Sequence, residues 1–269
     1  MMKNKFLFFP ALIIILVAVS ACGPTVVTST IPVPGGAEAT DVPTQPPTTA
    51  PIIPSIISEC DNPLYPVVVG ATWTYVISGP PDSTQDRTIQ EVRSDGFTDH
   101  DEFSGGTSRT GEWTCSNGDL IALNPAASGA TTASMITAGT MADFQTTSSD
   151  GMTLPAVVTE GTNWTQNMTL EGIQTFNNIE VASKLTFSNN CTGGGIESVT
   201  VAAGTFNARR VDCIGSFNIT ITMNGMEIPT ASTATTTLWY AEGVGMVKNS
   251  SILSDGTTST VELTAYNIP

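Results

Sequence analysis

Residues 216–223 constrain the fold most, because they alternate strictly between polar and apolar side chains in the order Ser, Phe, Asn, Ile, Thr, Ile, Thr, Met. Successive side chains of a β-strand point to opposite faces, so this period of two predicts a strand that is buried on one face only. The strand runs directly into Asn224-Gly225, a pair that tolerates positive φ and is typical of a two-residue hairpin turn. The segment therefore predicts an antiparallel sheet.

The same turn chemistry recurs along the chain. The five pairs are Asp95-Gly96, Asn117-Gly118, Asp150-Gly151, Asn224-Gly225 and Asp255-Gly256. Helical periodicity with capping residues is not evident beyond the first 22 residues, and abundant threonine and serine suit solvent-facing strand positions. The sequence predicts an all-β fold with a single antiparallel meander domain of about ten strands, twisted into a half-barrel or an open sandwich. Residues 129–147 fit a flap, a short helix or an irregular strand.

The first 22 residues have the layout of an exported chain. A basic start precedes an apolar run from Phe6 to Val19, and a Val-Ser-Ala triplet leads into Cys22. A membrane-spanning helix needs about 20 apolar residues, and this run is shorter and contains Pro10. The triplet resembles the bacterial lipobox, which implies that 1–21 is a lipoprotein signal helix and that Cys22 is lipidated. Acyl chains on Cys22 would make the membrane a partner of a protein that does not span it.

A segment rich in proline and threonine follows. Its prolines, at positions 24, 32, 34, 43, 46, 47, 51 and 54, remove backbone donors and favour extended polyproline II conformations. We interpret 22–59 as the lipidated cysteine plus a disordered tether that reaches about 110 Å when extended, and 60–269 as the β domain. The alternative, a proline-rich ligand for a partner domain, needs repeated Pro-x-x-Pro units.

The charge of the chain argues against a nucleic-acid partner. All 24 acidic residues and only seven of the nine basic ones follow the signal, so the mature chain has a formal charge of −17. Phosphate binding depends on clustered lysine and arginine, and only Arg209 and Arg210 are adjacent in the mature chain.

Four cysteines follow Cys22, namely Cys60, Cys115, Cys191 and Cys213. An even number in an exported chain indicates disulfides, and four cysteines allow three pairings. We expect Cys60 with Cys115 and Cys191 with Cys213, because each pair joins neighbouring strands within one half of the domain. A zinc site is the alternative, but there is no Cys-x-x-Cys spacing and His100 is the only histidine, so we expect no metal.

Two segments open alike, each with an apolar run, a glycine and then a tryptophan: Leu64–Thr74 and Leu154–Thr165. Three further motifs carry a specific resemblance: Tyr65-Pro66-x-x-x-Gly70-x-x-Trp73-x-Tyr75, then Val199 to Val211 with Ala203-Gly204-Thr205-Phe206, then Trp239-Tyr240-Ala241-x-Gly243-Val244-Gly245-x-Val247-Lys248. Together they resemble a widespread group of uncharacterised bacterial envelope lipoproteins, although Ala202 stands where that group usually has proline. The group is distantly similar to the half-barrel of periplasmic lipoprotein carriers.

The aromatic residues of these motifs have two interpretations. As structural residues, Ala203-Gly204 makes a tight reversal between strands, and Trp239-Tyr240 closes the sheet over the core. As functional residues, Trp73, Trp164, Trp239 and Tyr240 line the concave face of a half-barrel and bind an apolar ligand.

Catalytic signals are weak. The chain contains no Gly-x-Ser-x-Gly elbow, no His-Glu-x-x-His helix and no Gly-x-Gly-x-x-Gly loop, so we predict no enzyme, no catalytic residue and no cofactor. The densest polar cluster runs from Asp99 through His100 and Asp101 to Glu102, followed by Glu112. Strand alternation places Asp99 and Asp101 on one face, which suits loose calcium binding or a sugar site, but we expect such a run to be solvated.

Three functions remain. The sequence favours a lipoprotein of the cell envelope, facing the periplasm or the exterior, whose domain is a non-catalytic binding module for an apolar or amphiphilic ligand or for an envelope component. The alternative is a structural or protein-interaction lipoprotein without a pocket. A carbohydrate-active hydrolase ranks third, because it needs carboxylates that converge in a cleft.

Overall fold

The computed structural model describes residues 58–79, 82–124, 144–176, 179–223 and 225–269. The predicted signal helix and lipidated Cys22, nearly all of the predicted tether, and most of the ambiguous segment 129–147 lie outside these residues. The described part is therefore the predicted β domain with the last residues before it.

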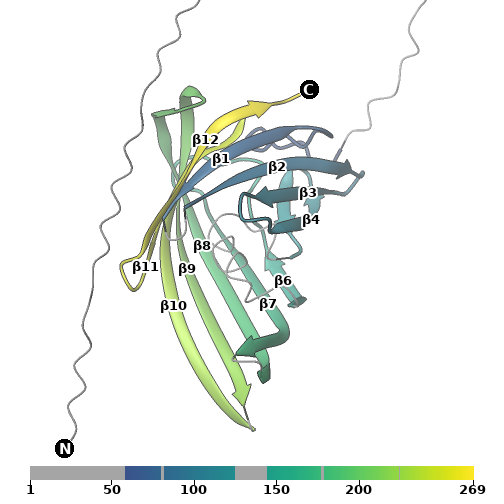
Figure 1. Ribbon diagram of the computed structural model, residues 1–269. Helices are drawn as coiled ribbons and strands as arrows, with labels where there is room; N and C mark the ends of the chain where they lie inside the picture. The colour runs from purple at the N-terminus through teal and green to yellow at the C-terminus, as the bar shows by residue number, and fades with distance from the viewer. Residues whose placement is uncertain (1–57, 80–81, 125–143, 177–178, 224) are drawn as a thin grey trace, which may run out of the picture. The chain divides into compact units, whose positions relative to one another are not determined.

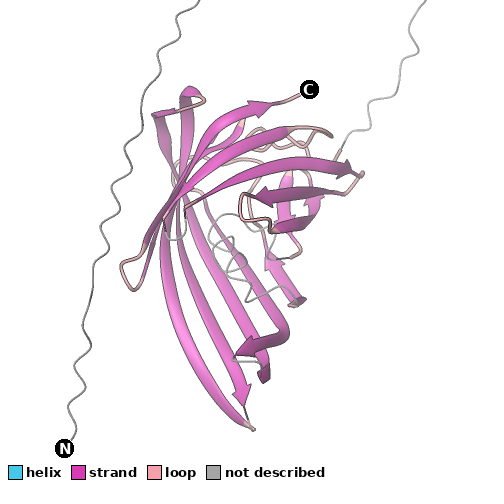
Figure 2. Ribbon diagram, viewed as in Figure 1, coloured by secondary structure: helices cyan, strands magenta, loops and turns pink. Residues whose placement is uncertain are grey.

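In the described ranges, twelve strands form one antiparallel sheet (Figures 1 and 2). They are β1 (Thr72–Ser78), β2 (Ser83–Val92), β3 (Gly96–Phe103), β4 (Ser108–Ser116), β5 (Asp119–Ala122), β6 (Gln145–Gly151), β7 (Asn163–Phe176), β8 (Ile179–Val201), β9 (Gly204–Met223), β10 (Met226–Ala241), β11 (Gly245–Leu253) and β12 (Thr258–Asn267). The order is β5-β4-β3-β2-β1-β12-β11-β10-β9-β8-β7-β6. Every neighbour is a sequence neighbour except β1 and β12, so the predicted meander is confirmed, with the first and last strands paired.

The two ends of this sheet approach each other. Leu120 in β5 and Leu154, which precedes β7, form an isolated antiparallel bridge. The Leu120 amide donates to the Leu154 carbonyl at 2.9 Å, and the Ser149 hydroxyl of β6 donates to the Ala122 carbonyl of β5 at 3.1 Å. We call this junction the seam. It makes the sheet nearly closed, which confirms the barrel-like form of the prediction.

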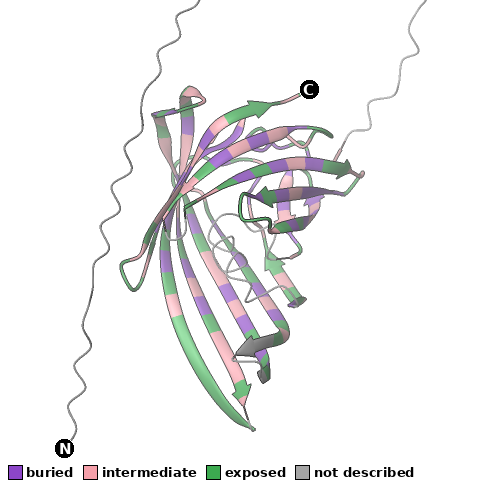
Figure 3. Ribbon diagram, in the orientation of Figure 1, coloured by how far each residue is buried: buried purple, intermediate pink, exposed green. Residues whose placement is uncertain are grey.

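Strand alternation builds the core on the inner face of the sheet (Figure 3). In β4 the pattern is regular, with Arg109, Gly111, Trp113 and Cys115 buried between exposed or half-buried neighbours. The largest fully buried side chains include Trp73, Tyr75, Phe97 and Phe217. β10 differs, because its first six residues, Met226 to Ala231, are all exposed. The long strands β8, β9 and β10 extend past the rest of the sheet in Figure 1.

Three of the five predicted turn pairs, Asp95-Gly96, Asn117-Gly118 and Asp255-Gly256, lie at a connection between strands that follow each other in the sheet and the chain, and Asn224 of a fourth pair lies outside the described residues. Asn117 and Gly118 have φ angles of 52° and 87° and join β4 to β5. The pair Asp150-Gly151 is the exception, and its prediction as a hairpin was wrong. Gly151 ends β6, whereas the partner strand β7 begins only at Asn163. The intervening residues form the seam with β5, which a local turn signal does not encode.

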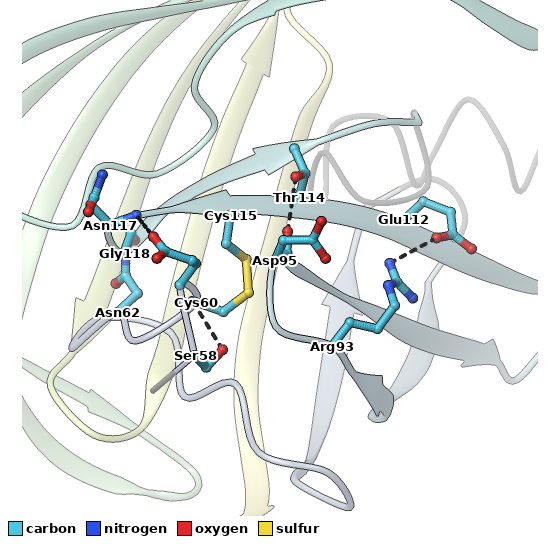
Figure 4. Close-up of a disulfide and its surroundings, with 11 residues drawn as sticks. Ser58, Cys60, Asn62, Arg93, Asp95, Glu112, Thr114, Cys115, Asn117 and Gly118 are labelled. Atoms are coloured by element: carbon cyan, nitrogen blue, oxygen red, sulfur yellow. Dashed lines mark hydrogen bonds and ion pairs between the residues drawn. A yellow bond between two sulfur atoms is a disulfide. The ribbon is translucent and has the colours of Figure 1, made fainter. Parts of the chain in front are cut away.

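Both expected disulfides are present. Cys60 bonds Cys115, and Cys191 bonds Cys213, whose residues lie directly opposite each other in β8 and β9. The first disulfide joins the start of the domain to the end of β4 (Figure 4). Glu59 reinforces this junction, because its carboxylate accepts from the Asn117 amide at 2.7 Å and its carbonyl accepts from the Gly118 amide at 2.7 Å.

Within the described ranges, no helix is both long and apolar enough to cross a membrane.

Candidate binding site inside the sheet

A row of charged side chains crosses the inner face at one side of the sheet. Arg87 in β2 lies opposite Asp101 in β3, and Asp101 lies opposite Arg109 in β4. Arg87 binds Asp101 through two nitrogens, at 2.7 and 2.9 Å, and Arg109 Nε binds the same carboxylate at 2.6 Å. Asp101 is 1% exposed, so one carboxylate holds two guanidinium groups in the core. We call Arg87, Asp99, Asp101 and Arg109 the buried charge cluster.

The fourth member, Asp99, has weaker partners. Its Oδ2 accepts from the Tyr65 hydroxyl at 3.0 Å and lies 3.6 Å from Arg87 Nε, whereas Oδ1 has no hydrogen-bond partner. Burial raises the pKa of Asp99, and the charge of Arg87 offsets only part of this effect. Burial would also raise the pKa of Asp101, but Arg87 and Arg109 outweigh it and hold that pKa well below its usual range. The two carboxylates therefore differ in proton affinity although they are two residues apart.

The expectation that the run from Asp99 to Glu102 is solvated was wrong for its two aspartates. Alternation does place them on one face, as predicted, but that face is the core. The neighbouring Glu102 points outward and is 73% exposed. The arginines explain the difference, since a carboxylate enters a core only when it is paired. Among the described residues, no group of three or more histidine, cysteine, aspartate or glutamate side chains is arranged to hold a metal ion.

Next to this cluster lies a largely enclosed cavity of about 70 Å³. Its lining comes from the segment before β1, from the seam, from β2 and β4, and from β7 to β11: Tyr65, Gln85, Arg87, Trp113, Leu120, Thr153, Leu154, Trp164, Gln166, Asn189, Cys191, Val211, Cys213, Thr236, Leu238, Tyr240, Met246 and Asn249. A water molecule needs about 10–15 Å³, so there is room for several. The space is too small for a long acyl chain.

Buried polar groups gather around this cavity. Asn249 is 1% exposed, and its Nδ2 has no hydrogen-bond partner, although its Oδ1 accepts from the Ser251 hydroxyl at 3.0 Å. The Trp113 indole nitrogen is also buried, and it lies close enough to Asp99 to lower the pKa of that carboxyl. Burial raises the pKa of Tyr240 to about 12, so its hydroxyl keeps its proton at neutral pH.

The four aromatic residues predicted to bind a ligand divide into two pairs. Trp164 and Tyr240 line the cavity. Trp73 is core packing: it is 2% exposed, its ring stacks on Tyr65, and its indole donates to the Val244 carbonyl at 2.6 Å. Trp239 is absent from the lining, and its indole donates at 2.8 Å to Glu197, which also pairs with Arg210. The predicted aromatic set is therefore not a single site.

Sequence reasoning missed the cavity's polar residues and the partners of the buried aspartates. Gln85, Arg87 and Arg109 were not considered, yet they alternate with polar neighbours in β2 and β4. Gln85 and Arg87 lie four and two residues before the buried Ile89, so they share its face of β2. This alternation is the one sequence signal that the two polar side chains are buried.

The inner face has a different character where β7 to β10 extend. Register places Ile221 of β9 opposite Ile228 of β10, and Met223 opposite Met226. Ile221 and Met223 lie an even number of residues from the cavity-lining Cys213 in β9, and Met226 and Ile228 lie an even number from the cavity-lining Thr236 in β10. Side chains at even spacing along a strand point to the same face, so all four residues belong to the inner face. Met226 is 67% exposed and Ile228 is 46% exposed. We call these four residues the apolar stripe.

The opposite face of the same strands is polar. Glu171, Lys184, Thr220, Thr222 and Glu227 gather there around a shallow groove, with Lys184 and Glu171 paired at 3.0 Å. The extension is therefore amphipathic, with an exposed apolar inner side.

The profile of one protein family matches residues 107–262, which is more than half of the chain and runs from β4 into β12. The chain belongs to the DUF3108-like family. The matched range contains the apolar stripe and the cavity-lining residues of β7 to β11, whereas Arg87, Asp99 and Asp101 precede it. No curated protein matches the sequence.

Two solved structures are similar to this chain at low sequence identity. A predicted lipoprotein of Parabacteroides distasonis superposes with a TM-score of 0.51 at 12% identity, covering 77% of this chain and 99% of its own. A predicted exported protein of Bacteroides fragilis, with a YmcC-like fold, gives a TM-score of 0.47 at 14% identity, covering 76% and 98%. The first of these supports the antiparallel fold of this DUF3108-like protein.

Proposed function

We propose that this protein is an extracytoplasmic lipoprotein, anchored through Cys22, whose β domain is a non-catalytic binding module for an amphiphilic molecule. The apolar part of that molecule lies on the apolar stripe. The observation that carries the proposal is the exposure of Met226 and Ile228 on the inner face, next to Ile221 and Met223.

Burial of the exposed apolar side chains by a ligand would favour binding. Covering one methionine or isoleucine side chain contributes about 1.5–3 kcal/mol relative to leaving it exposed, so covering two provides a driving force for binding. Polar residues occupy the outer side of the same strands, where Glu171 and Lys184 pair. On the inner side the exposed apolar side chains are adjacent, whereas on the outer side the exposed Ile173 lies near this charged pair.

The location has separate support. The apolar run, the small-residue triplet and Cys22 have the order of a lipoprotein signal, and the proline-rich residues that follow suit a tether. The structural neighbours include a predicted lipoprotein and a predicted exported protein, which is consistent with the cell envelope.

The test is binding of a fluorescent fatty-acid probe by the full-length mature protein and two matched variants. Ile228→Asn removes an apolar side chain from the stripe. Ile173→Asn makes the same change at a residue of opposite strand parity in β7, which is 53% exposed. We expect Ile228→Asn to weaken probe binding about tenfold, which corresponds to about 1.4 kcal/mol, and Ile173→Asn to leave it unchanged.

Equal affinities for the two variants, or no probe binding by the parent protein, would contradict the proposal. The second result would favour the alternative role, a structural or protein-interaction lipoprotein.

A further inference from the structure

The enclosed cavity has a chemistry that the apolar stripe does not share. Among its described lining residues, Arg87 is the only charged side chain. The carboxylates nearest to Arg87, Asp101 and Asp99, belong to the buried charge cluster and do not line the cavity. The lining therefore includes a guanidinium group, which Asp101 already pairs, and no carboxylate.

The uncharged polar groups of the lining are rich in hydrogen-bond donors. Asn249 Nδ2 is a buried donor without a partner, whereas Trp113 Nε1 is a buried donor close to the Asp99 carboxylate. Asn189 and Tyr240 also line the cavity. A buried donor without a partner costs about 1–3 kcal/mol, so a group that accepts from these donors would be stabilised.

Apolar side chains complete the wall. Val211, Leu238 and Met246 line the cavity along with the Cys191–Cys213 disulfide. A ligand with a small hydrocarbon part and an acceptor group would match both kinds of surface.

We propose that this cavity binds a small carboxylate, of the size of acetate, whose oxygens accept hydrogen bonds from Asn249 and its neighbouring donors beside Arg87. A carboxylate offers about four acceptor positions and carries the charge that Arg87 attracts. An ammonium ion only donates hydrogen bonds, so it could not accept from these donors, and the charge of Arg87 would repel it. Water is the competing occupant, because a polar cavity of this size also accommodates several water molecules.

Access to the cavity involves the seam. Leu120, Thr153 and Leu154 are lining residues, and they are also the residues whose backbone bonds hold β5 to the segment before β7. A local opening of this junction would admit a small solute, and we expect exchange to be slow for that reason.

The test uses the tryptophan indole signals in nuclear magnetic resonance spectra of the full-length mature protein in detergent. The chain has four tryptophans, which single Trp→Phe variants assign. Acetate is the probe, with acetamide and ethylamine as neutral and cationic matches. We expect acetate to shift the Trp113 indole signal and to leave that of Trp239, which donates to Glu197 outside the cavity, unchanged.

Variants locate the site. Asn249→Leu should weaken acetate binding about tenfold to a hundredfold, because it removes a hydrogen bond to a charged group. Asn218→Leu makes the same change at an exposed position of β9 and should have no effect. If Asn249→Leu disturbs the Trp73 core signal, Asn189→Leu replaces it.

Three results would overturn the proposal: no acetate-dependent shift, which would leave water as the occupant; equal shifts with acetamide or ethylamine; or unchanged acetate binding in the cavity variant. None of them depends on the fatty-acid probe, so this proposal and the proposed function fail separately.

Discussion

Replacing Asp101 by asparagine tests the energetic role of the buried charge cluster. The substitution keeps the side-chain shape but removes the charge that Arg87 and Arg109 share. The two arginine side chains are 7% and 4% exposed, so solvent would not compensate for the loss. Breaking a buried ion pair by removing one partner costs about 3–5 kcal/mol. Two arginines depend on this carboxylate, so we expect the upper part of that range.

Urea unfolding, followed by tryptophan fluorescence, measures the effect. With a slope of about 2 kcal/mol per molar urea, a loss of 4 kcal/mol lowers the midpoint by roughly 2 M. Asp212→Asn is the matched control, because Asp212 also pairs with an arginine but is 42% exposed. An exposed pair contributes about 0–1 kcal/mol, so the control should move the midpoint by less than roughly 0.5 M. Equal shifts for the two variants would refute the reasoning.

The remaining predictions concern pH, the disulfides and one turn. Since the pKa of Asp101 is lowered in the folded protein, its contribution to stability is fully present above the unfolded value of about 3.9 and is lost as pH falls toward the folded value. Below about pH 4, the free energy of unfolding should therefore fall less steeply with falling pH for Asp101→Asn than for the parent protein. Parallel pH dependences for the two proteins would contradict this. Loss of the Cys60–Cys115 disulfide, whose cysteines are 55 residues apart, should lower the free energy of unfolding by about 4 kcal/mol. Loss of the Cys191–Cys213 disulfide, whose cysteines are 22 residues apart, should lower it by about 3 kcal/mol. Single Cys→Ser variants measure both losses, and the reverse order would contradict the chain-entropy argument. Gly118→Ala should lower the melting temperature of the domain more than Gly256→Ala does. Both glycines have positive φ, but a Cβ at Gly118 would lie 2.6 Å from the Asp61 carbonyl oxygen, whereas no atom lies within 4 Å of a Cβ at Gly256. Equal melting temperatures would exclude the steric argument.

The strands with strong alternation were predictable, because alternation and turn pairs are local signals. Ser216 to Met223 forms the end of β9, and Asn117-Gly118 makes the hairpin between β4 and β5. The estimate of about ten strands missed short elements such as β6, since Gln145 to Gly151 lacks apolar alternation.

The arrangement around the site was less predictable. The disulfide pairs followed from chain order, but the seam depends on Leu120 meeting Leu154 across the two ends of the sheet. The buried cluster depends on three adjacent strands in register, which place Arg87 and Arg109 on either side of Asp101. A sequence presents these residues as separate charges, so their pairing follows only from the strand order.

The most direct test of the binding role is native mass spectrometry of the full-length mature protein, purified from an oxidising compartment and measured before and after organic extraction. We predict a bound mass that extraction removes, on a chain four hydrogen atoms lighter than its fully reduced form because of its two disulfides. A protein that has the mass of the lipidated chain alone before extraction would contradict the proposal that the domain captures an amphiphile.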